Sequence, residues 1–382
     1  KLGIFHRAKN TRLFLTHLQA VNFKIYEQVT ADFTNKIVCF AGPNGSGKTN
    51  LLDAIHYLCI GKSYFSSTDY QNVRYGQNFF RVVGKFNFNG EVEQVSCAVE
   101  KGNKKILKRN KTEYEKISDH IGAFPVVVIA PDDLELVNGG SENRRKVLDF
   151  ILSFSDRKYL ETLMDYNRLL SQRNALLRKF WEERRFNHLL LESLDEQLAP
   201  RGTFLHDQRQ EFMQVFSNMF KDFYEEIAGS NEKATIKYQS ELSKESFHEL
   251  LERNLERDRM LQRTDVGIHK DDIVLKLNDH AVKRYGSQGQ KKSFLLALKL
   301  SQYRYLSEKL QTKPLLLLDD LFDKLDPLRA GQLVKLAASA EVGQVFITDT
   351  QPERLVQTFK PLDLTIDLYQ VNQGKIDAIV EA

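Results

Sequence analysis

A few short stretches of this chain combine glycine, lysine, hydroxyl and carboxylate residues in patterns that suit the binding of anions or metal ions, and the first lies between Phe40 and Asn50. There the sequence FAGPNGSGKTN follows the apolar run IVCF and fits the phosphate-loop pattern G-x-x-x-x-G-K-[ST]. Its glycines let the backbone wrap closely and aim N–H groups at phosphate oxygens, and the helix start that follows favours anions. We expect Lys48 to reach the β- and γ-phosphates and the Thr49 hydroxyl to ligate Mg²⁺. The candidate nucleotide-binding residues of this stretch are Gly42, Pro43, Asn44, Gly45, Ser46, Gly47, Lys48, Thr49 and Asn50.

A second stretch, LLLLDD at residues 315–320, joins the pattern of a buried strand to two carboxylates. Asp319 would hold Mg²⁺ through water, and Asp320 would orient or deprotonate an attacking water. Taken alone, the stretch also fits a capped core strand, but its pairing with the phosphate loop favours a nucleotide site. The candidate catalytic residues are therefore Lys48, Asp319 and Asp320, and the candidate metal ligands are Thr49 and Asp319.

A third stretch begins a long predicted helix, and its residues are Ser287, Gln288, Gly289 and Gln290. Hydroxyl and backbone donors at a helix N-terminus form an anion site, so we include these four residues among the nucleotide-binding candidates. An ordinary N-cap is the alternative, because Ser287 followed three residues later by Gln290 also has the spacing of a capping box. The two interpretations are compatible.

Basic residues gather in separate clusters that could neutralise the phosphates of a nucleic acid. One cluster lies in KGNKKILKRNKTEYEK, at residues 101–116, and the alternative there is a solvated edge strand protected by lysines. A second cluster lies at a predicted helix start, where either an external anion or an internal carboxylate could pair with it. Arginines between residues 168 and 185 are interpreted as a solvated helix face. The candidate DNA-binding residues are Lys104, Lys105, Lys108, Arg109, Lys111, Arg144 and Arg145.

Elements of two kinds must position these residues. Strand, phosphate loop and helix come early, short alternating strands follow from residue 79, and buried strands return after residue 314. Between them, residues 156–229 are helical and polar, with apolar residues at three- and four-residue steps. We therefore predict an α/β domain built from both ends of the chain, in residues 1–155 and 265–382, with a helical arm at residues 156–264 inserted between them.

Composition narrows the class of protein further. The chain has 382 residues, 42% of them hydrophobic, and a formal net charge of only +4, so any nucleic-acid surface must come from local clustering. Its three cysteines are far apart, which excludes a disulfide framework or a zinc pattern and favours a reducing cytoplasm. No apolar stretch approaches the roughly 20 residues of a membrane span. His269, Asp271 and Asp272 could suggest a metal site, but two carboxylates and one histidine are weak evidence for one, and we favour a structural role that joins the arm to the head.

Together, the three stretches and Asp323-Lys-Leu-Asp326 resemble the phosphate loop, signature, Walker B strand and D-loop of the ABC-type ATPases. The chain is more closely similar to the RecF family, which is related to the heads of SMC proteins. This resemblance covers nearly the whole chain. It rests on the following segments: GPNGSGKTNLLDAI, APDDLELVNGGSENRRKVLD, YNRLLSQRNALL, LDEQLA, GIHKDD, GSQGQKK and LLLLDDLFDKLD.

The resemblance implies an ABC-type P-loop ATPase head, with a mixed sheet, an antiparallel β-subdomain and a helical arm. It implies ATP and Mg²⁺ as ligands, with Ser287 and Gly289 acting in trans in an ATP-dependent homodimer. It further implies a weak, DNA-stimulated ATPase of DNA replication, damage repair, recombination and the SOS response. Such a protein would bind gapped or duplex DNA as a closed dimer and, with RecR and RecO, let RecA load. Slow hydrolysis would then release the DNA.

Some residues depart from the related patterns and keep other functions open. ABC transporters place a histidine after the last core strand, whereas residues 347–350 are Ile-Thr-Asp-Thr, and Asp132 or Asp133 would have to replace their Q-loop glutamine. These absences count against a transporter subunit. An ATP-binding scaffold with negligible turnover stays open, because Asp320 is shorter than the usual glutamate. A small-molecule kinase is disfavoured, since residues 287–290 would have no role in it.

Overall fold

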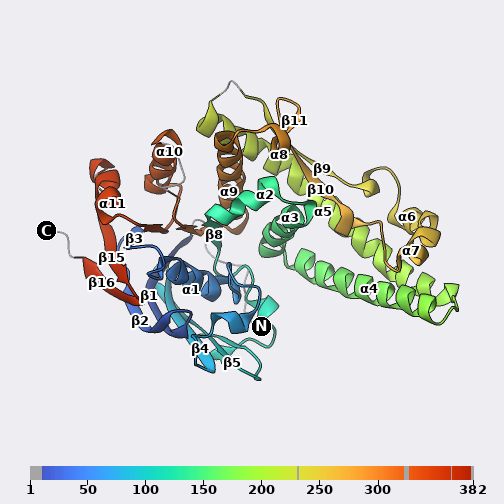
Figure 1. Cartoon of the computed structure of the whole chain (residues 1–382), viewed down its shortest axis with the longest axis horizontal. Helices are drawn as coiled ribbons and strands as arrows, with labels where there is room; N and C mark the ends of the chain where they lie inside the picture. The colour runs from blue at the N-terminus through green and yellow to red at the C-terminus, as the bar shows by residue number, and fades with distance from the viewer. Residues whose placement is uncertain (1–10, 230–231, 322–326, 363, 380–382) are drawn as a thin grey trace. The chain divides into compact units, whose positions relative to one another are not determined.

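The computed structural model describes residues 11–229, 232–321, 327–362 and 364–379 (Figure 1). The chain divides into a first unit, made of residues 1–133 with 302–382, and a second unit, residues 134–301. The elements of the first unit before the division are β1 (Thr11–Phe23), β2 (Tyr26–Asp32), β3 (Ile37–Ala41), α1 (Lys48–Ile60), β4 (Phe79–Phe88), β5 (Glu91–Glu100), β6 (Ile106–Arg109), β7 (Thr112–Glu113) and β8 (Val126–Ile129). Those after it are β12 (Thr312–Lys313), β13 (Leu315–Leu318), α10 (Pro327–Ala338), β14 (Val345–Asp349), α11 (Pro352–Phe359), β15 (Ile366–Asn372) and β16 (Lys375–Ile379).

A largely antiparallel sheet with the order β12-β1-β4-β5-β6-β7 forms one layer of the first unit, with β2 also paired to β1 and the short β12 paired to β1 in parallel. Strand β1 buries Leu13, Leu15, Leu18 and Ala20, so the strict alternation of buried residues shifts once along the strand. The shift falls where the pairing of β1 with β4 is irregular, between Leu15 and His17. A bulge of this kind lets the strand keep one apolar face towards the core.

A mixed sheet with the order β16-β15-β3-β14-β13-β8 forms the other layer. Strands β15, β3, β14, β13 and β8 pair in parallel, and β3, β8, β13 and β14 are buried along their whole length. Four consecutive apolar residues suit such a strand because both of its faces are covered. The carboxyl ends of β3, β14 and β13 therefore lie side by side, at the edge where ligands bind in parallel sheets.

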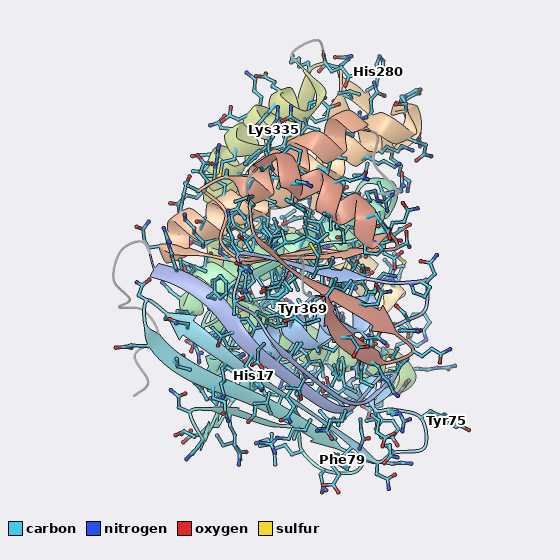
Figure 2. The ribbon with its side chains drawn as sticks, turned by 90° about the vertical axis from the view of Figure 1, so that its left-hand side faces the viewer. His17, Tyr75, Phe79, His280, Lys335 and Tyr369 are labelled. Atoms are coloured by element: carbon cyan, nitrogen blue, oxygen red, sulfur yellow. The ribbon has the colours of Figure 1, made fainter. Side chains whose placement is uncertain are left out.

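Helix α1 packs against strands of both sheets. Its apolar residues, including Leu51, Leu52 and Ile55, are fully buried. The helix ends where Gly61 adopts φ 75° and donates its N–H to Tyr57 O, a common way for a glycine to end a helix. In Figure 2, Tyr369 of β15 lies among the strands of the first unit, whereas the exposed Tyr75 and Phe79 lie at its outer edge.

Two long helices dominate the second unit. Asp156 caps α4 by accepting from Lys158 N and Tyr159 N, and Asn187 caps α5 by accepting from Leu190 N. A small antiparallel sheet, β11-β10-β9, packs beside α5. The elements of this unit are α2 (Glu135–Asn138), α3 (Ser141–Ser155), α4 (Arg157–Glu182), α5 (His188–Ala228), β9 (Ala234–Gln239), α6 (Phe247–Arg253), α7 (Leu255–Leu261), β10 (Asp272–Leu277), β11 (His280–Ala281), α8 (Val282–Tyr285) and α9 (Gln288–Leu310), which continues into the first unit.

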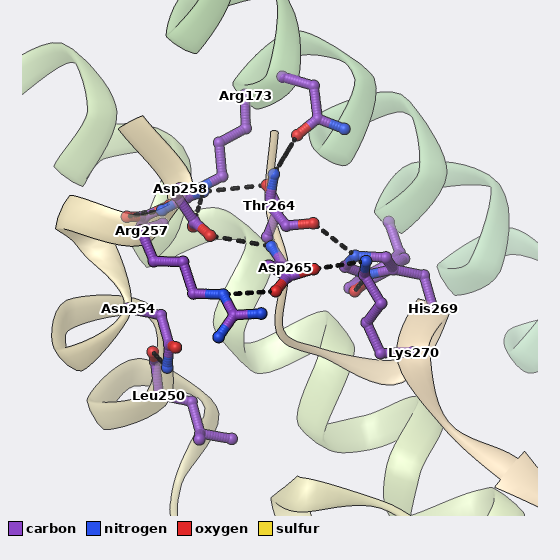
Figure 3. Close-up of polar contacts among 12 residues, drawn as sticks. Arg173, Leu250, Asn254, Arg257, Asp258, Thr264, Asp265, His269 and Lys270 are labelled. Carbon is purple, nitrogen blue, oxygen red and sulfur yellow. Dashed lines mark hydrogen bonds and ion pairs between the residues drawn. The ribbon is translucent and has the colours of Figure 1, made fainter. Parts of the chain in front are cut away.

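A buried ion-pair network joins α4, α5 and α7 (Figure 3). The fully buried Arg173 of α4 lies 2.5 Å from Asp195 of α5 and 2.6 Å from the equally buried Asp258 of α7. It also donates to Thr264 Oγ1 at 2.9 Å. Because a buried guanidinium must have partners for its donors, this arginine fixes the packing of three helices.

The predicted α/β architecture with a long helical insertion is confirmed, and so are the buried strands at residues 37–41 and 315–318. All three cysteines are buried and free. No helix of the described residues is long and apolar enough to cross a membrane. The division at residues 156 and 264 into head and arm stays a prediction, and the predicted D-loop, Asp323–Asp326, lies outside the described residues.

Candidate functional site

The phosphate loop joins β3 to α1 and depends on glycine. Gly45 and Gly47 have φ values of 76° and 114°, a region that other residues rarely adopt. A Cβ atom on Gly42 would lie 2.1 Å from Val371 O, and one on Gly47 would lie 2.5 Å from Ile25 Cδ1. The neighbouring strands thus leave no space for side chains at positions 42 and 47, and the loop backbone is free to approach a ligand on its open side.

The loop's own carbonyl groups hold the predicted phosphate-binding lysine. Lys48 Nζ donates to Gly42 O at 2.7 Å and to Pro43 O at 3.0 Å, and the residue is only 6% exposed. The Lys48 ammonium is therefore held against the backbone of the loop, whose N–H groups are further donors. This combination of charge and donors fits the oxygens of a polyphosphate.

Two candidate metal ligands that are far apart in the sequence meet at this loop. Thr49 Oγ1 donates to Asp319 Oδ1 at 2.8 Å, and Thr348 Oγ1 donates to the same oxygen at 2.8 Å. Burial is the main reason why the pKa of Asp319 is raised, and the two hydroxyl donors oppose that shift. A hydroxyl and a carboxylate oxygen at hydrogen-bond distance are the hard oxygen ligands that Mg²⁺ prefers.

Asp320 adopts an unusual backbone conformation beside Asp319. Its φ is 46°, and its N–H donates to Thr348 Oγ1 at 2.9 Å. Among the described residues, its Oδ1 is buried and has no hydrogen-bond partner, and the same is true of Ser46 Oγ in the loop. An unpaired buried polar atom costs about 1–3 kcal/mol, so two of them in one site indicate a polar ligand. The loop, Thr49 and the two aspartates therefore fit a magnesium nucleotide.

Thr348, at the carboxyl end of β14, is the residue that sequence reasoning missed. In the sequence, residues 347–350 stand out only because they lack a histidine. In the structure, the fully buried Thr348 hydroxyl bridges the Asp319 carboxylate and the Asp320 backbone. The sequence does show a hydroxyl residue near the end of a buried strand. That this strand lies beside β13, which precedes Asp319, follows only from the order of strands in the sheet.

The two aspartates considered as replacements for a Q-loop glutamine have different environments. Asp133 accepts from Ala130 N at 2.8 Å and from the Tyr64 hydroxyl, so it caps the turn that follows β8. Asp132 is exposed. The side chain of Asp133 is thus engaged in local contacts, and Asp132 is the one that faces solvent.

The predicted signature forms a capping box at the start of α9. Ser287 N donates to Gln290 Oε1 at 2.7 Å, and Gln290 N donates to Ser287 Oγ at 3.2 Å. Gln290 Nε2 donates to Glu232 Oε1 at 2.6 Å. Ser287 and Gln288 are exposed, while Gly289 and Gln290 are half-buried. The cap that the sequence predicted is confirmed, and an exposed helix start remains available to a partner.

The basic hairpin at residues 101–116 contains side chains with different roles. Lys105 Nζ donates to Gly61 O and lies 2.7 Å from Asp69 Oδ2. Arg109 makes a two-pronged contact with Glu93, at 2.6 and 2.7 Å, and its guanidinium lies over the Phe124 ring. These two side chains face internal partners. The other three candidates face solvent, with Lys104 and Lys111 exposed and Lys108 half-buried.

The second basic cluster also contacts internal partners. Arg144 pairs with Asp272, with donor–acceptor distances of 2.8 and 2.9 Å, and Arg145 Nη1 donates to Asp271 O at 2.6 Å. Of the two alternatives left open for this cluster, the geometry favours the internal carboxylate. DNA binding by these two residues stays a prediction without geometric support.

His269, Asp271 and Asp272 take part in the same internal contacts. His269 Nδ1 accepts from the Tyr166 hydroxyl at 2.8 Å, and Nε2 donates to Thr264 O at 3.1 Å. Asp271 accepts from the buried Arg209 at 3.1 Å. Burial lowers the pKa of His269 to about 4, which favours the neutral ring that these contacts require. These hydrogen bonds with buried partners support the structural interpretation of His269 and Asp271.

Comparisons with known proteins agree with this site. The family model described as the RecF/RecN/SMC N terminal domain matches residues 14–377. The DNA replication and repair protein RecF of Flavobacterium johnsoniae is 42% identical over 359 residues, which are 94% of this chain and all of that protein.

Solved structures point to the same family. A structure of the recombination mediator protein RecF with ATP, in the RecFOR pathway, has a TM-score of 0.88 and 30% identity and covers 98% of this chain and all of its own. The Smc head domain of Pyrococcus furiosus, at 15% identity, TM-score 0.57 and 96% coverage of each chain, shares the fold. The ABC-type head predicted from the sequence is therefore confirmed, and the chain belongs to the RecF family, within the RecF/RecN/SMC N-terminal domain family.

Proposed function

We propose that this chain is an ATP-dependent DNA-binding protein of recombinational repair, with slow ATP hydrolysis that is stimulated by DNA. The observation that carries the proposal is the contact between Thr49 and Asp319, 270 residues apart, beside two buried polar atoms that lack partners. Its relatives are named as DNA replication and repair proteins, and the ATP-bound RecF structure is named as a recombination mediator. Both names support this class of function.

Each residue of the site has a role that follows from its chemistry. Lys48 would exchange its loop carbonyls for phosphate oxygens, and the Ser46 hydroxyl would gain the partner that it lacks. Thr49 and Asp319 would hold Mg²⁺, which supplies neutralisation of phosphate charge when bound. Asp320 would orient the attacking water or accept its proton, because its buried Oδ1 is available.

The signature residues would complete the nucleotide site only in a dimer of this chain. We infer that residues 287–290 of one copy close on the nucleotide of another, so that ATP joins two heads into a dimer. Ser287 supports this role because it combines an exposed hydroxyl with the N-terminus of a 23-residue helix. The dimer would bind duplex or gapped DNA, act with RecR and RecO in the loading of RecA, and release DNA after hydrolysis.

Two exposed lysines and one half-buried lysine of the hairpin are the DNA contacts that we propose from the predicted set. Lys104, Lys108 and Lys111 have no ion-pair partner among the described residues, so each could pair with a backbone phosphate. Lys105 and Arg109 already neutralise Asp69 and Glu93. We therefore expect the three solvent-facing lysines to contribute to affinity and its salt dependence without reading base sequence.

The first experiment follows a fluorescent gapped duplex by anisotropy, without nucleotide, with Mg-ADP and with Mg-ATP. Sedimentation of the same samples reports the oligomeric state, and phosphate release reports turnover with and without DNA. Wild type is compared with Lys48→Met and with Lys85→Met, which removes an exposed lysine of β4 and serves as the matched control.

Tight DNA binding and dimerisation that require Mg-ATP, persist in Lys85→Met and disappear in Lys48→Met would support the proposal. DNA binding that is indifferent to nucleotide would leave the phosphate loop without the proposed role. ATP binding with no DNA-stimulated phosphate release would instead favour the scaffold alternative. Absence of DNA binding in every state would contradict the DNA-binding role of the isolated chain.

A further inference from the structure

The turn between α4 and α5 lies near α7 at one end of the second unit (Figure 1). Side chains of this turn and of α7 line a groove with an apolar floor. Its volume is about 380 Å³. Leu177 and Phe186 line it, Trp181 is 57% exposed and Met260 is 67% exposed. Large apolar side chains exposed together on one surface indicate a binding surface, and tryptophan, methionine and arginine are enriched at interfaces.

The groove is held in a defined shape by contacts within the turn. Arg185 N donates to Phe180 O at 3.2 Å, and the Phe180 and Phe186 rings pack edge to face with centroids 5.2 Å apart. The Arg259 guanidinium lies 4.2 Å from the centre of the Phe186 ring and is fixed by Glu256 at 2.6 Å. A ligand would therefore meet a preformed surface, which lowers the entropy lost on binding.

The charges around the groove do not balance. Lys179 pairs with Glu183, Arg257 with Asp265, and Arg259 with Glu256. Glu182 is an exposed acidic residue of this end without an ion-pair partner among the described residues. Four exposed arginines of the same end also have no ion-pair partner among the described residues: Arg178, Arg184, Arg185 and Arg263. The surface around the apolar floor is therefore positively charged.

We propose that this groove, defined by Leu177, Trp181, Phe186 and Met260 and bordered by Arg184 and Arg185, binds an acidic protein segment that carries a bulky apolar side chain. The apolar side chain would be buried against the exposed Trp181 and Met260, and the acidic residues beside it would pair with the two arginines of the turn. This site is separate in the sequence and in chemistry from the nucleotide site, and the proposal does not depend on the proposed ATPase cycle.

A single-stranded nucleic acid is the other class of ligand that arginine and tryptophan can bind, and the groove suits it less well. The floor includes flexible and aliphatic side chains, Met260 and Leu177, which suit an apolar anchor more than a row of stacked bases.

The fluorescence of Trp181 reports binding at the groove directly, because Trp181 is the only tryptophan in the sequence. The full chain is titrated with a synthetic peptide of aspartate and glutamate residues around one phenylalanine and one leucine, while tryptophan emission is recorded. Three probes serve as comparisons: the same peptide with lysines for its acidic residues, the same peptide with serines for its two apolar residues, and oligo-dT. We expect a saturable blue shift of the Trp181 emission with the acidic apolar peptide alone.

Charge reversal at the turn tests the proposed border. The double variant Arg184→Glu, Arg185→Glu should weaken peptide binding about tenfold or more, since each reversal replaces an attraction with a repulsion. Lys237→Glu with Lys276→Glu makes the same change of net charge at two exposed positions of β9 and β10, away from the groove, and should bind as wild type does.

The proposal is overturned if the acidic peptide leaves the Trp181 emission unchanged, or if both double variants weaken binding equally. It is also overturned if the lysine peptide or oligo-dT binds as tightly as the acidic peptide. Equal circular dichroism spectra and melting temperatures of the two double variants would show that a loss of binding is not a loss of folding.

Discussion

At the scale of the residue, a single hydroxyl organises the end of the Walker B strand. Thr348 Oγ1 donates to Asp319 Oδ1 and accepts from Asp320 N, so it links the proposed metal ligand to the proposed base. Asp320 has φ 46°, and the accepted hydrogen bond helps to hold this strained conformation. We infer that Thr348 is a positioning residue for both carboxylates.

Replacing Thr348 with valine keeps the volume of the side chain and removes the hydroxyl. We expect the turnover number for ATP to fall about tenfold to a hundredfold, since the change removes two hydrogen bonds at a buried carboxylate and its neighbour. Nucleotide affinity should change far less, because Lys48 and the loop remain. Thr348→Ser should restore most of the activity, and single-turnover phosphate release with nucleotide titration separates the two effects. Equal losses in the serine and valine variants would contradict the positioning role.

A second prediction at the scale of the residue concerns the glycines of the phosphate loop. Gly47→Ala should destabilise the fold by at least about 1 kcal/mol more than Gly45→Ala, in denaturant unfolding. Both positions have positive φ, but a Cβ on Gly47 would lie 2.5 Å from Ile25 Cδ1 and 2.8 Å from the Tyr26 hydroxyl oxygen, whereas one on Gly45 meets nothing within 4 Å. Similar losses in the free energy of unfolding of the two variants would contradict this prediction. They would show that the side chains of Ile25 and Tyr26 move aside at little cost.

At the scale of the element, buried ion pairs decide how the helices of the second unit pack. Arg173 joins α4 to α5 and α7 through Asp195 and Asp258 (Figure 3). Arg209 of α5 in turn contacts Asp149 of α3 and Asp271, next to β10. The sequence indicated an arginine-rich solvated face between residues 168 and 185, and that interpretation fits the exposed Arg178, Arg184 and Arg185 but not Arg173, which is fully buried.

Removing Arg173 should therefore be far more damaging than removing a neighbouring arginine. Arg173→Leu leaves the buried Asp258 carboxylate without its partner, and we expect a loss of about 3–5 kcal/mol in the free energy of unfolding. The matched control Arg178→Leu, on an exposed position of the same helix, should change stability by less than about 0.5 kcal/mol. Chemical denaturation monitored by Trp181 fluorescence measures both, and comparable losses would contradict a structural role for the network.

At the scale of the whole molecule, burial makes stability depend on pH. His120 Nε2 donates to Leu58 O at 2.7 Å, and its Nδ1 is buried without a partner. Burial lowers the pKa of His120 to about 4, and the pKa of His269 is also about 4. Both rings are thus neutral in the folded chain at neutral pH, and a proton on the buried Nδ1 of His120 would find no acceptor among the described residues.

We expect the free energy of unfolding to fall as the pH falls from about 6.5 to about 4. In the unfolded chain, His120 and His269 bind protons with a pKa near 6.5. In the folded chain they bind protons only when the pH falls to about 4, so acid favours the unfolded state. The contribution of His120 alone is about 3 kcal/mol over this range. Denaturant unfolding across the range measures the slope, and His120→Gln should reduce it while His188→Gln, an exposed histidine, should not. An unchanged slope in His120→Gln would contradict this assignment.

The features of this chain that depend on local pattern could be predicted from the order of its amino acids. The glycine spacing at residues 42–47 fixes a phosphate loop, the leucines of β13 fix a buried strand, and Ser287 with Gln290 fixes a helix start. Each of these depends on neighbours within a few residues, where backbone geometry and burial leave few alternatives.

Only the tertiary structure decided which charged and polar side chains have partners. Thr348 meets Asp319 because β14 pairs with β13, Arg144 meets Asp272 across 128 residues, and Lys105 meets Asp69 across 36. A long cation carries no local signal of its partner, since its charge is satisfied equally by solvent, by a phosphate or by a carboxylate brought close by the fold. The residues of the nucleotide site could therefore be predicted from the sequence. Which charged side chains are buried with partners and which face solvent depends on the tertiary structure.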